Sequence, residues 1–121
     1  MPRREEVIKE VLETIKKVSG VENVAVITMD GTVMGSDLSP TLHSETFGIM
    51  CATMFGAAVT ANAEIERPLP NRIVSESDKG ILVINHATSD LLIVVNCKLD
   101  TSFSELGKEI EKSIKMVSEG F

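Results

Sequence analysis

Residues 42–65 read LHSETFGIMCATMFGAAVTANAEI, and this stretch decides how the rest of the chain is organised. It predicts one long helix of roughly 36 Å at about 1.5 Å per residue. Projected at about 100° per residue, its apolar positions cover much more than one face. One side carries Phe47, Met50, Cys51, Met54, Ala58, Ala61 and Ile65, and Gly48, Ala52, Phe55, Val59 and Ala63 extend it.

Only a narrow strip of this helix is polar, formed by Thr46, Thr53, Thr60 and Glu64. A helix that covers one sheet buries a single stripe and exposes the rest. The stretch therefore predicts a partner on a second side of the helix, most simply a second copy of the chain.

Composition predicts a single domain over residues 1–121. The length is 121 residues, with 43% apolar and 25% charged residues, which is ordinary for a globular protein. The net charge of −6 argues against a nucleic-acid partner, because binding to nucleic acid depends on neutralising phosphates. The chain also has no Trp or Tyr on which bases could stack.

The chain shows no targeting or membrane signal. It begins MPRREEVIKEV, which is charged and helical where a signal peptide would be apolar. Polar residues interrupt the long helix, and we expect no run of the roughly 18 apolar residues that a membrane span needs. We therefore expect a cytoplasmic protein without direct membrane insertion.

Cysteine and histidine usage predicts no metal site and no cofactor. Cys51 and Cys97 are too few and too far apart for a disulfide scaffold or a zinc site, and we interpret them as small buried hydrophobic residues. His43 and His86 have no neighbouring ligand at metal-binding spacing.

Hydrophobic periodicity and turn residues predict eight elements. In order they are a helix over 3–18, strands over 23–29 and 32–36, the long helix, strands over 72–77, 81–86 and 91–97, and a helix from 103 to about 118. Asp30-Gly31 predicts a type I′ hairpin turn between the first two strands. Ser102 with Glu105 fits a capping box at the start of the last helix.

These elements predict an α/β (α+β) three-layer sandwich around a five-stranded antiparallel sheet. The first, fourth and fifth strands are apolar on both faces, so they are central, and the short second and polar third strands are edges. With short hairpin connections, the strand order that satisfies both conditions is 2-1-5-4-3. The first and last helices cover one face, and the long helix covers the other.

The open third strand and the second apolar side of the long helix predict a two-fold dimer interface. Both features would be covered if two sheets joined at this edge and the long helices packed antiparallel. Small residues at Gly48, Ala52 and Gly56 would allow a close approach. The predicted interface comprises Phe47, Gly48, Met50, Cys51, Ala52, Met54, Phe55, Gly56, Val59, Arg72, Ile73, Val74, Ser75 and Glu76.

No catalytic constellation is present in the sequence, so we expect a binding protein and not an enzyme. The chain has no phosphate-binding glycine loop and no nucleophile elbow. An alternative is a small-molecule sensor domain with a ligand between helix and sheet. That alternative needs a polar group in a cavity, and the strands offer only Thr28, Asn85 and Asn96.

Three stretches give the chain a resemblance to the Roadblock/dynein light-chain family, of the stand-alone prokaryotic kind that includes the polarity protein MglB. They are the hairpin NVAVITMDGTVMGS, the helix FGIMCATMFGAAVTANAEI and the strand–turn–strand RIVSESDKGILVINH. The opening helix, which ends in Gly20-Val21-Glu22, fits the same family.

The resemblance implies a dimeric platform that binds and regulates a small Ras-like GTPase, with a dimer formed through the long helix and the third strand. MglB-like members stimulate GTP hydrolysis without supplying an arginine finger, so Arg67 and Arg72 are not assigned a catalytic role. The identity of the GTPase, the effect on hydrolysis or exchange, and the choice between homodimer and heterodimer stay open.

Overall fold

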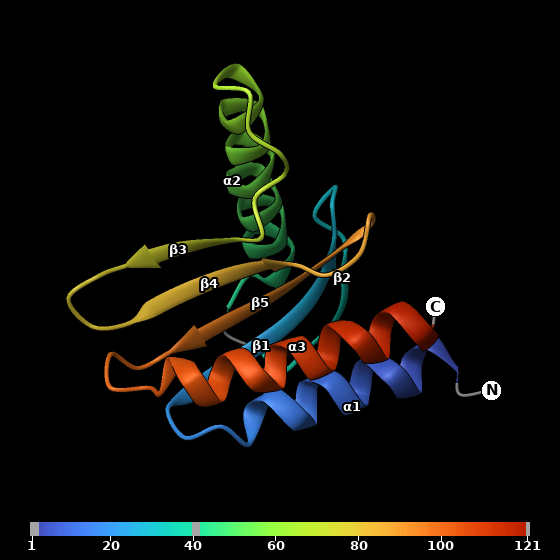
Figure 1. The fold of residues 1–121 in the computed structure, drawn as a ribbon. Helices are drawn as coiled ribbons and strands as arrows, with labels where there is room; N and C mark the ends of the chain where they lie inside the picture. Colours follow the sequence, from blue (N-terminus) through green and yellow to red (C-terminus); the bar gives the residue numbers. More distant parts are fainter. Residues whose placement is uncertain (1–2, 40–41, 121) are drawn as a thin grey trace.

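A computed structural model describes residues 3–39 and 42–120 of the chain. The eight elements lie in the predicted order (Figure 1). They are α1 (Arg4–Lys16), β1 (Val21–Thr28), β2 (Val33–Ser36), α2 (Ser44–Glu64), β3 (Arg72–Glu76), β4 (Ile81–His86), β5 (Leu91–Cys97) and α3 (Phe103–Gly120).

The sheet confirms the predicted strand order, β2-β1-β5-β4-β3, with every neighbouring pair antiparallel. Short connections favour the hairpins β1–β2, β3–β4 and β4–β5. The pairing of β1 with β5 then joins the β1–β2 hairpin to the other three strands in one sheet. The short β2 and the exposed β3 form the edges, as the short length of β2 and the polar character of β3 predict.

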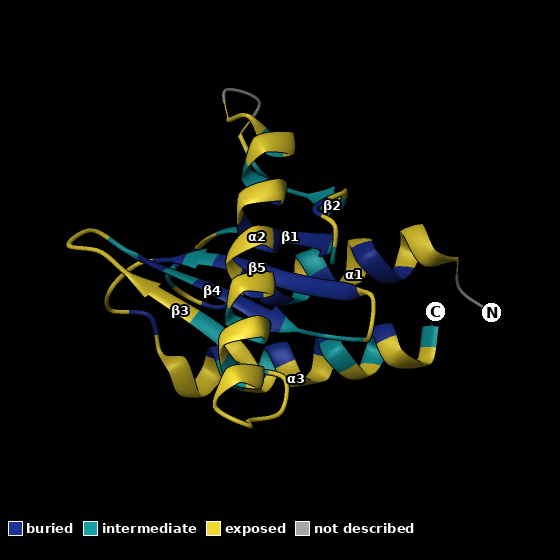
Figure 2. Ribbon diagram, turned by 90° about the horizontal axis from the view of Figure 1, so that it is seen from above, coloured by how far each residue is buried: buried dark blue, intermediate teal, exposed yellow. Residues whose placement is uncertain are grey.

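Two apolar cores lie on opposite faces of this sheet, which confirms the layers. Seen from above, α2 lies in front of the largely buried central strands (Figure 2). The larger core joins α1 and α3 to alternate residues of the central strands, including Val26, Val83 and Ile93. The smaller core joins α2 to the other alternate residues, including Ile84 and Val94. Alternation along each strand explains why β1, β4 and β5 are apolar throughout.

The β1–β2 hairpin forms as predicted, but the predicted type I′ turn is wrong. That turn needs a positive φ at both Asp30 and Gly31, and only Gly31 has one, at 96°. The Gly31 N–H donates to the Thr28 carbonyl over 3.0 Å, and the Thr28 N–H donates to the Thr32 carbonyl over 2.9 Å. This is a three-residue loop that ends in a left-handed glycine.

Asp30 serves this loop through its side chain. Its carboxylate accepts hydrogen bonds from the Thr28 hydroxyl, from the Thr32 N–H over 3.3 Å and from the Thr32 hydroxyl over 3.1 Å. These donors, the Thr28 hydroxyl first, lower the pKa of Asp30. These hydrogen bonds hold the side chain of Asp30 over the loop, while its backbone keeps a negative φ.

The chain leaving β2 is fastened to β1 and α1 by Asp37. Its carboxylate accepts the Val24 N–H over 2.6 Å and pairs with Lys16 over 2.5 Å, and its own N–H donates to the Val24 carbonyl over 3.1 Å. This side chain continues the ladder past the end of the short β2. It also places the start of the segment that leads to α2.

The last helix begins at the predicted position, with one of the two hydrogen bonds of the predicted capping box. The Ser102 hydroxyl accepts the Glu105 N–H over 3.3 Å, which satisfies one of the free donors of the first turn. One buried face of α3 then packs toward α1 and the sheet through Leu106, Ile110 and Val117.

Candidate functional site

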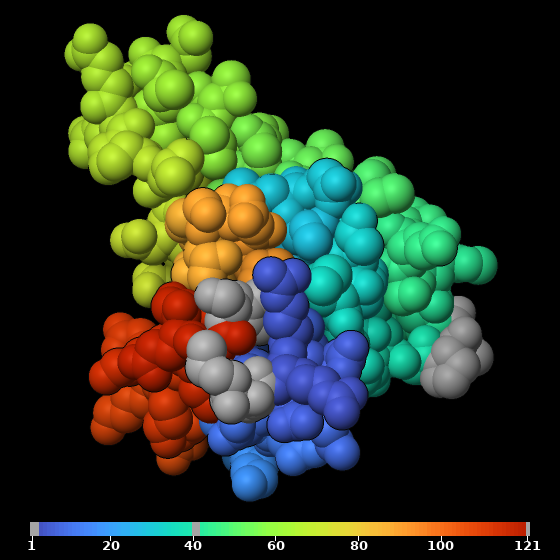
Figure 3. Space-filling view, turned by 90° about the vertical axis from the view of Figure 1, so that its right-hand side faces the viewer, coloured from blue at the N-terminus to red at the C-terminus, as the bar shows by residue number. Residues whose placement is uncertain are grey.

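Helix α2 has two halves with different surroundings. Its buried residues are Gly48, Cys51, Ala52 and Phe55, and none lies beyond Phe55. Phe55 is fully buried, and its ring stacks on His86 with the centroids 5.6 Å apart. Beyond Phe55, α2 crosses β3 and projects past the edge of the sheet as an arm (Figure 3). We call residues 57–64 the α2 overhang.

Four of the predicted interface residues lie inside the protomer. Gly48, Cys51, Ala52 and Phe55 face the sheet of their own chain, so they are not available to a partner. A Cβ on Gly48 would lie 2.6 Å from the Gly31 carbonyl oxygen. This glycine therefore allows α2 to approach the β1–β2 hairpin, and the close contact is intramolecular.

The exposed apolar side of α2 is a stripe at three- and four-residue spacing, which we call the α2 stripe: Met50, Met54, Ala57, Ala61 and Ile65. Met54 is 36% exposed and Ile65 is 65% exposed. The predicted interface did not include Ala57, Ala61 or Ile65, although their spacing from Met50 and Met54 is the signal that identifies them.

Gly56 lies on the opposite flank of α2, with nothing within 4 Å of the position of a Cβ. Ile49 shares this flank and lies beside Gly31 at the end of the β1–β2 hairpin. Because this flank faces the hairpin, the α2 stripe faces the other way along the sheet. The structure thus separates Gly56 from Met50 and Met54.

Beside the α2 stripe, the sheet has a row of residues that α2 leaves partly or fully exposed. On this face Ser75, Leu82, Asn96 and Asn23 are neighbours across β3, β4, β5 and β1. None of the four is buried, and Asn96 donates its side-chain N–H to the Asn23 side-chain oxygen over 3.0 Å. We call these residues the uncovered row. The adjacent row, which includes Ile73 and Ile84, is the one beneath α2.

Strand β3 is the open edge next to this row. It pairs with β4 on one side only, and within the described chain no strand pairs with its other side. Four of its five residues are exposed, and Val74 is 51% exposed. An unpaired strand edge is a template for a strand of another chain. The predicted residues Arg72, Ile73, Val74, Ser75 and Glu76 all belong to this edge.

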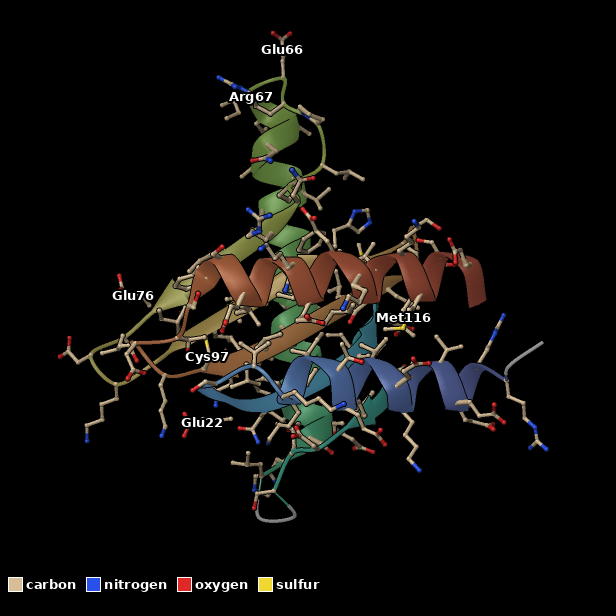
Figure 4. All side chains as sticks on the ribbon, turned by 60° about the horizontal axis from the view of Figure 1, so that its bottom comes forward. Glu22, Glu66, Arg67, Glu76, Cys97 and Met116 are labelled. Carbon is tan, nitrogen blue, oxygen red and sulfur yellow. The ribbon has the colours of Figure 1, made fainter. Side chains whose placement is uncertain are left out.

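The far end of α2 carries the one non-glycine residue with positive φ in the described chain, Glu66 at 58°. The Glu66 N–H donates to the Ala63 carbonyl over 3.1 Å, and the Arg67 N–H donates to the Asn62 carbonyl over 2.7 Å. These bonds form a Schellman motif, whose left-handed position normally holds glycine. Glu66 and Arg67 extend from the tip of the arm (Figure 4).

Replacing Glu66 with glycine is expected to stabilise the protomer by about 1 kcal/mol, because glycine has no Cβ penalty in the left-handed region. Urea unfolding at a fixed protomer concentration measures this gain. Glu64→Gly, inside the last helical turn, is the matched control and is expected to destabilise by about 0.5–1 kcal/mol. Equal effects of the two substitutions would contradict the assigned cap.

Among the described residues, we find no group of side chains arranged for catalysis or for metal binding. Over residues 3–39 and 42–120, no three His, Cys, Asp or Glu side chains gather closely enough to hold a metal ion. Burial raises the pKa of the Cys51 thiol to about 11, which makes it a poor nucleophile.

The polar groups considered for a small-molecule sensor are engaged by the chain itself. Asn85 is buried and donates to the Ile93 carbonyl over 3.0 Å. The Thr28 hydroxyl bonds Asp30, and Asn96 bonds Asn23. These contacts favour structural roles for the three side chains.

Helix α2 is long and apolar enough to cross a membrane by length and composition alone. The expectation that no stretch approaches a membrane span is therefore wrong on those two criteria. The helix nevertheless packs its inner side on the sheet through Cys51 and Phe55. A helix that covers a sheet meets the same criteria, and the α2 stripe is apolar surface of this helix that its own sheet leaves exposed.

Comparison with known proteins places these features in a family. Residues 7–96 match the family model of the Roadblock/LC7 domain. Two proteins of Methanocaldococcus jannaschii, the uncharacterized proteins MJ0310 and MJ1340, are each 30% identical over 88 residues, which cover 73% of this chain and 77% of each relative. The solved structure of MglB from Myxococcus xanthus is 16% identical, with a TM-score of 0.89 over 98% of this chain and 90% of that one.

Proposed function

This chain belongs to the Roadblock/LC7 family, and on that premise we propose that it is a non-catalytic dimeric platform that binds and regulates a small Ras-like GTPase. The dimer forms through the α2 stripe and the β3 edge. We place the protein in the cytoplasm, without a cofactor.

The α2 overhang is the observation that carries the dimer. Val59, near the start of the overhang, still packs over β3, but beyond it the helix carries exposed apolar residues past the edge of its own sheet. Apolar area in contact with water costs about 25 cal/mol per Å², so this surface favours a partner. The overhang projects beyond β3, on the side where the edge is open. A second chain joined at this edge brings its own sheet beneath the overhang.

The uncovered row fits this arrangement. In a two-fold pair, the overhang of one chain lies above β3 and β4 of its partner, where Ser75 is exposed and Leu82, at the border of the α2 core, is only partly buried. The same contact covers the α2 stripe, since the two helices run antiparallel side by side. One two-fold contact thus covers the α2 stripe, the uncovered row and the β3 edge.

The GTPase and the regulatory role are proposed from family membership. Two joined sheets with paired α2 helices offer a broad, rigid surface to a globular partner. Arg67 at the tip and Arg72 on the edge are exposed, but Arg72 lies in the proposed seam between the two chains. Neither residue is assigned a role in GTP hydrolysis.

The test has two stages, with the wild-type chain throughout. Light scattering coupled to size exclusion at micromolar concentration is expected to give the mass of a dimer. Small Ras-like GTPases encoded by the same genome are then assayed for binding and for single-turnover GTP hydrolysis with and without this protein. A monomer would overturn the interface, and a dimer that binds none of these GTPases would overturn the assigned partner.

A further inference from the structure

The exposed residues of β3 form a charge pattern that is complementary to itself. Arg72, Val74 and Glu76 alternate along the strand and point to the face covered by α1 and α3, because their neighbours on β4 include Val83 and Ile81. One end of this face is positive, the centre is apolar and the other end is negative. Reversed and laid beside itself, the strand places opposite charges together.

From this pattern we infer that the β3 edge selects a second copy of this chain in a single register, with Arg72 opposite the partner's Glu76 and Val74 on the two-fold axis. The inference rests on the proposed dimer and adds to it the identity of the partner and the alignment of the seam. The related chains MJ0310 and MJ1340 come from one organism, so at least one genome encodes more than one chain of this kind.

Geometry limits the registers that a two-fold pair of β3 strands can adopt. Directly opposite residues in an antiparallel pair point to the same face of the sheet. A two-fold axis perpendicular to the sheet must therefore place one residue of β3 directly opposite the same residue of the partner strand. Within the central part of β3 the axis can pass beside Ile73, Val74 or Ser75. Only the Val74 register places Arg72 opposite Glu76.

The position of α2 selects the same register independently. Val59 of α2 and Ile73 of β3 pack in the same cluster, so α2 crosses β3 near Ile73. An axis at Ile73 would drive the two overhanging helices into each other. An axis at Ser75 would separate the two helices by four residues of strand, about 14 Å, which is beyond the 8–10 Å of packed helices.

An axis at Val74 separates the two crossing points by two residues, about 7 Å, which is slightly closer than typical packed helices. Such a close approach needs small side chains between the helices. The α2 stripe supplies them at Ala57 and Ala61, in the part of α2 that passes the edge. Charge pattern and helix spacing therefore lead to the same alignment.

Charge reversal tests the register. Arg72→Glu places glutamate opposite glutamate, and Glu76→Arg places arginine opposite arginine, twice in each dimer. Each single variant is expected to weaken self-association by about ten-fold or more, because like charges directly opposite are destabilising. Mixing the two variants restores both pairs, so they are expected to form a heterodimer of wild-type affinity. The double variant R72E/E76R is expected to self-associate like the wild type.

Matched controls lie on the same hairpin, beyond the seam. Lys79→Glu and Asp78→Arg change the net charge by the same amounts as the two seam variants, at exposed positions in the β3–β4 turn. Sedimentation velocity at 0.15 M salt measures all the affinities, and far-UV circular dichroism checks that each variant is folded. Both controls are expected to dimerise like the wild type.

The outcomes separate this inference from the proposed function. A monomeric wild-type chain would overturn the proposed dimer, and the register with it. A dimeric wild type whose single variants associate as tightly as their controls would leave the dimer in place and overturn the register. Weakened single variants that fail to associate with each other would also overturn the pairing of Arg72 with Glu76.

Discussion

Substituting Met54 with glutamate is expected to convert the dimer to monomers at micromolar concentration. Met54 lies in the middle of the α2 stripe and is 36% exposed in the protomer. In the proposed dimer its remaining surface is covered twice, once in each chain. Losing these contacts and burying a charge should cost about 3 kcal/mol or more, which is over 100-fold in affinity.

The control for this experiment is Thr60→Glu on the polar strip of the same helix. Thr60 is exposed and faces away from both the sheet and the α2 stripe, so its variant is expected to stay dimeric. Sedimentation equilibrium of both variants gives the masses. Retention of the dimer by Met54→Glu would show that α2 pairs through another side or not at all.

Truncating Phe55 to alanine is expected to destabilise the protomer by about 3–5 kcal/mol, the range for removing a fully buried phenylalanine. Phe55 has no exposed surface and is the largest fully buried side chain described. It anchors α2 on the sheet and stacks on His86. The cavity left in this small core cannot collapse easily, because rigid strands form its floor.

Urea unfolding in the Met54→Glu background measures this loss, because a monomeric background removes the concentration dependence that a dimer adds to stability. Phe103→Ala is the matched control, since Phe103 is 48% exposed at the start of α3. Its loss is expected to stay below about 1 kcal/mol. Similar losses for the two phenylalanines would contradict the assignment of Phe55 to the core.

The elements were predictable because their patterns are strong and local. Strands β4 and β5 have the bounds that alternation and turn residues predict, and the strand order follows from short hairpins and two-sided apolar strands. The type I′ turn predicted at Asp30-Gly31 is the local prediction that was wrong. The dipeptide favours a two-residue turn, but the neighbouring Thr28 and Thr32 supply donors to the Asp30 carboxylate and favour a longer loop.

By itself the sequence of residues 42–65 determined that one long helix carries more apolar surface than a single sheet can cover, because helical periodicity assigns each side chain a direction around the axis. It could not determine which part of that surface faces inward. The tertiary structure decided this where Gly48 meets Gly31 and Phe55 enters the sheet, placing Gly56 on one flank and Met50 and Met54 on the other. The rotation of a helix about its axis depends on contacts with residues distant in the chain, and these exist only once the sheet has formed.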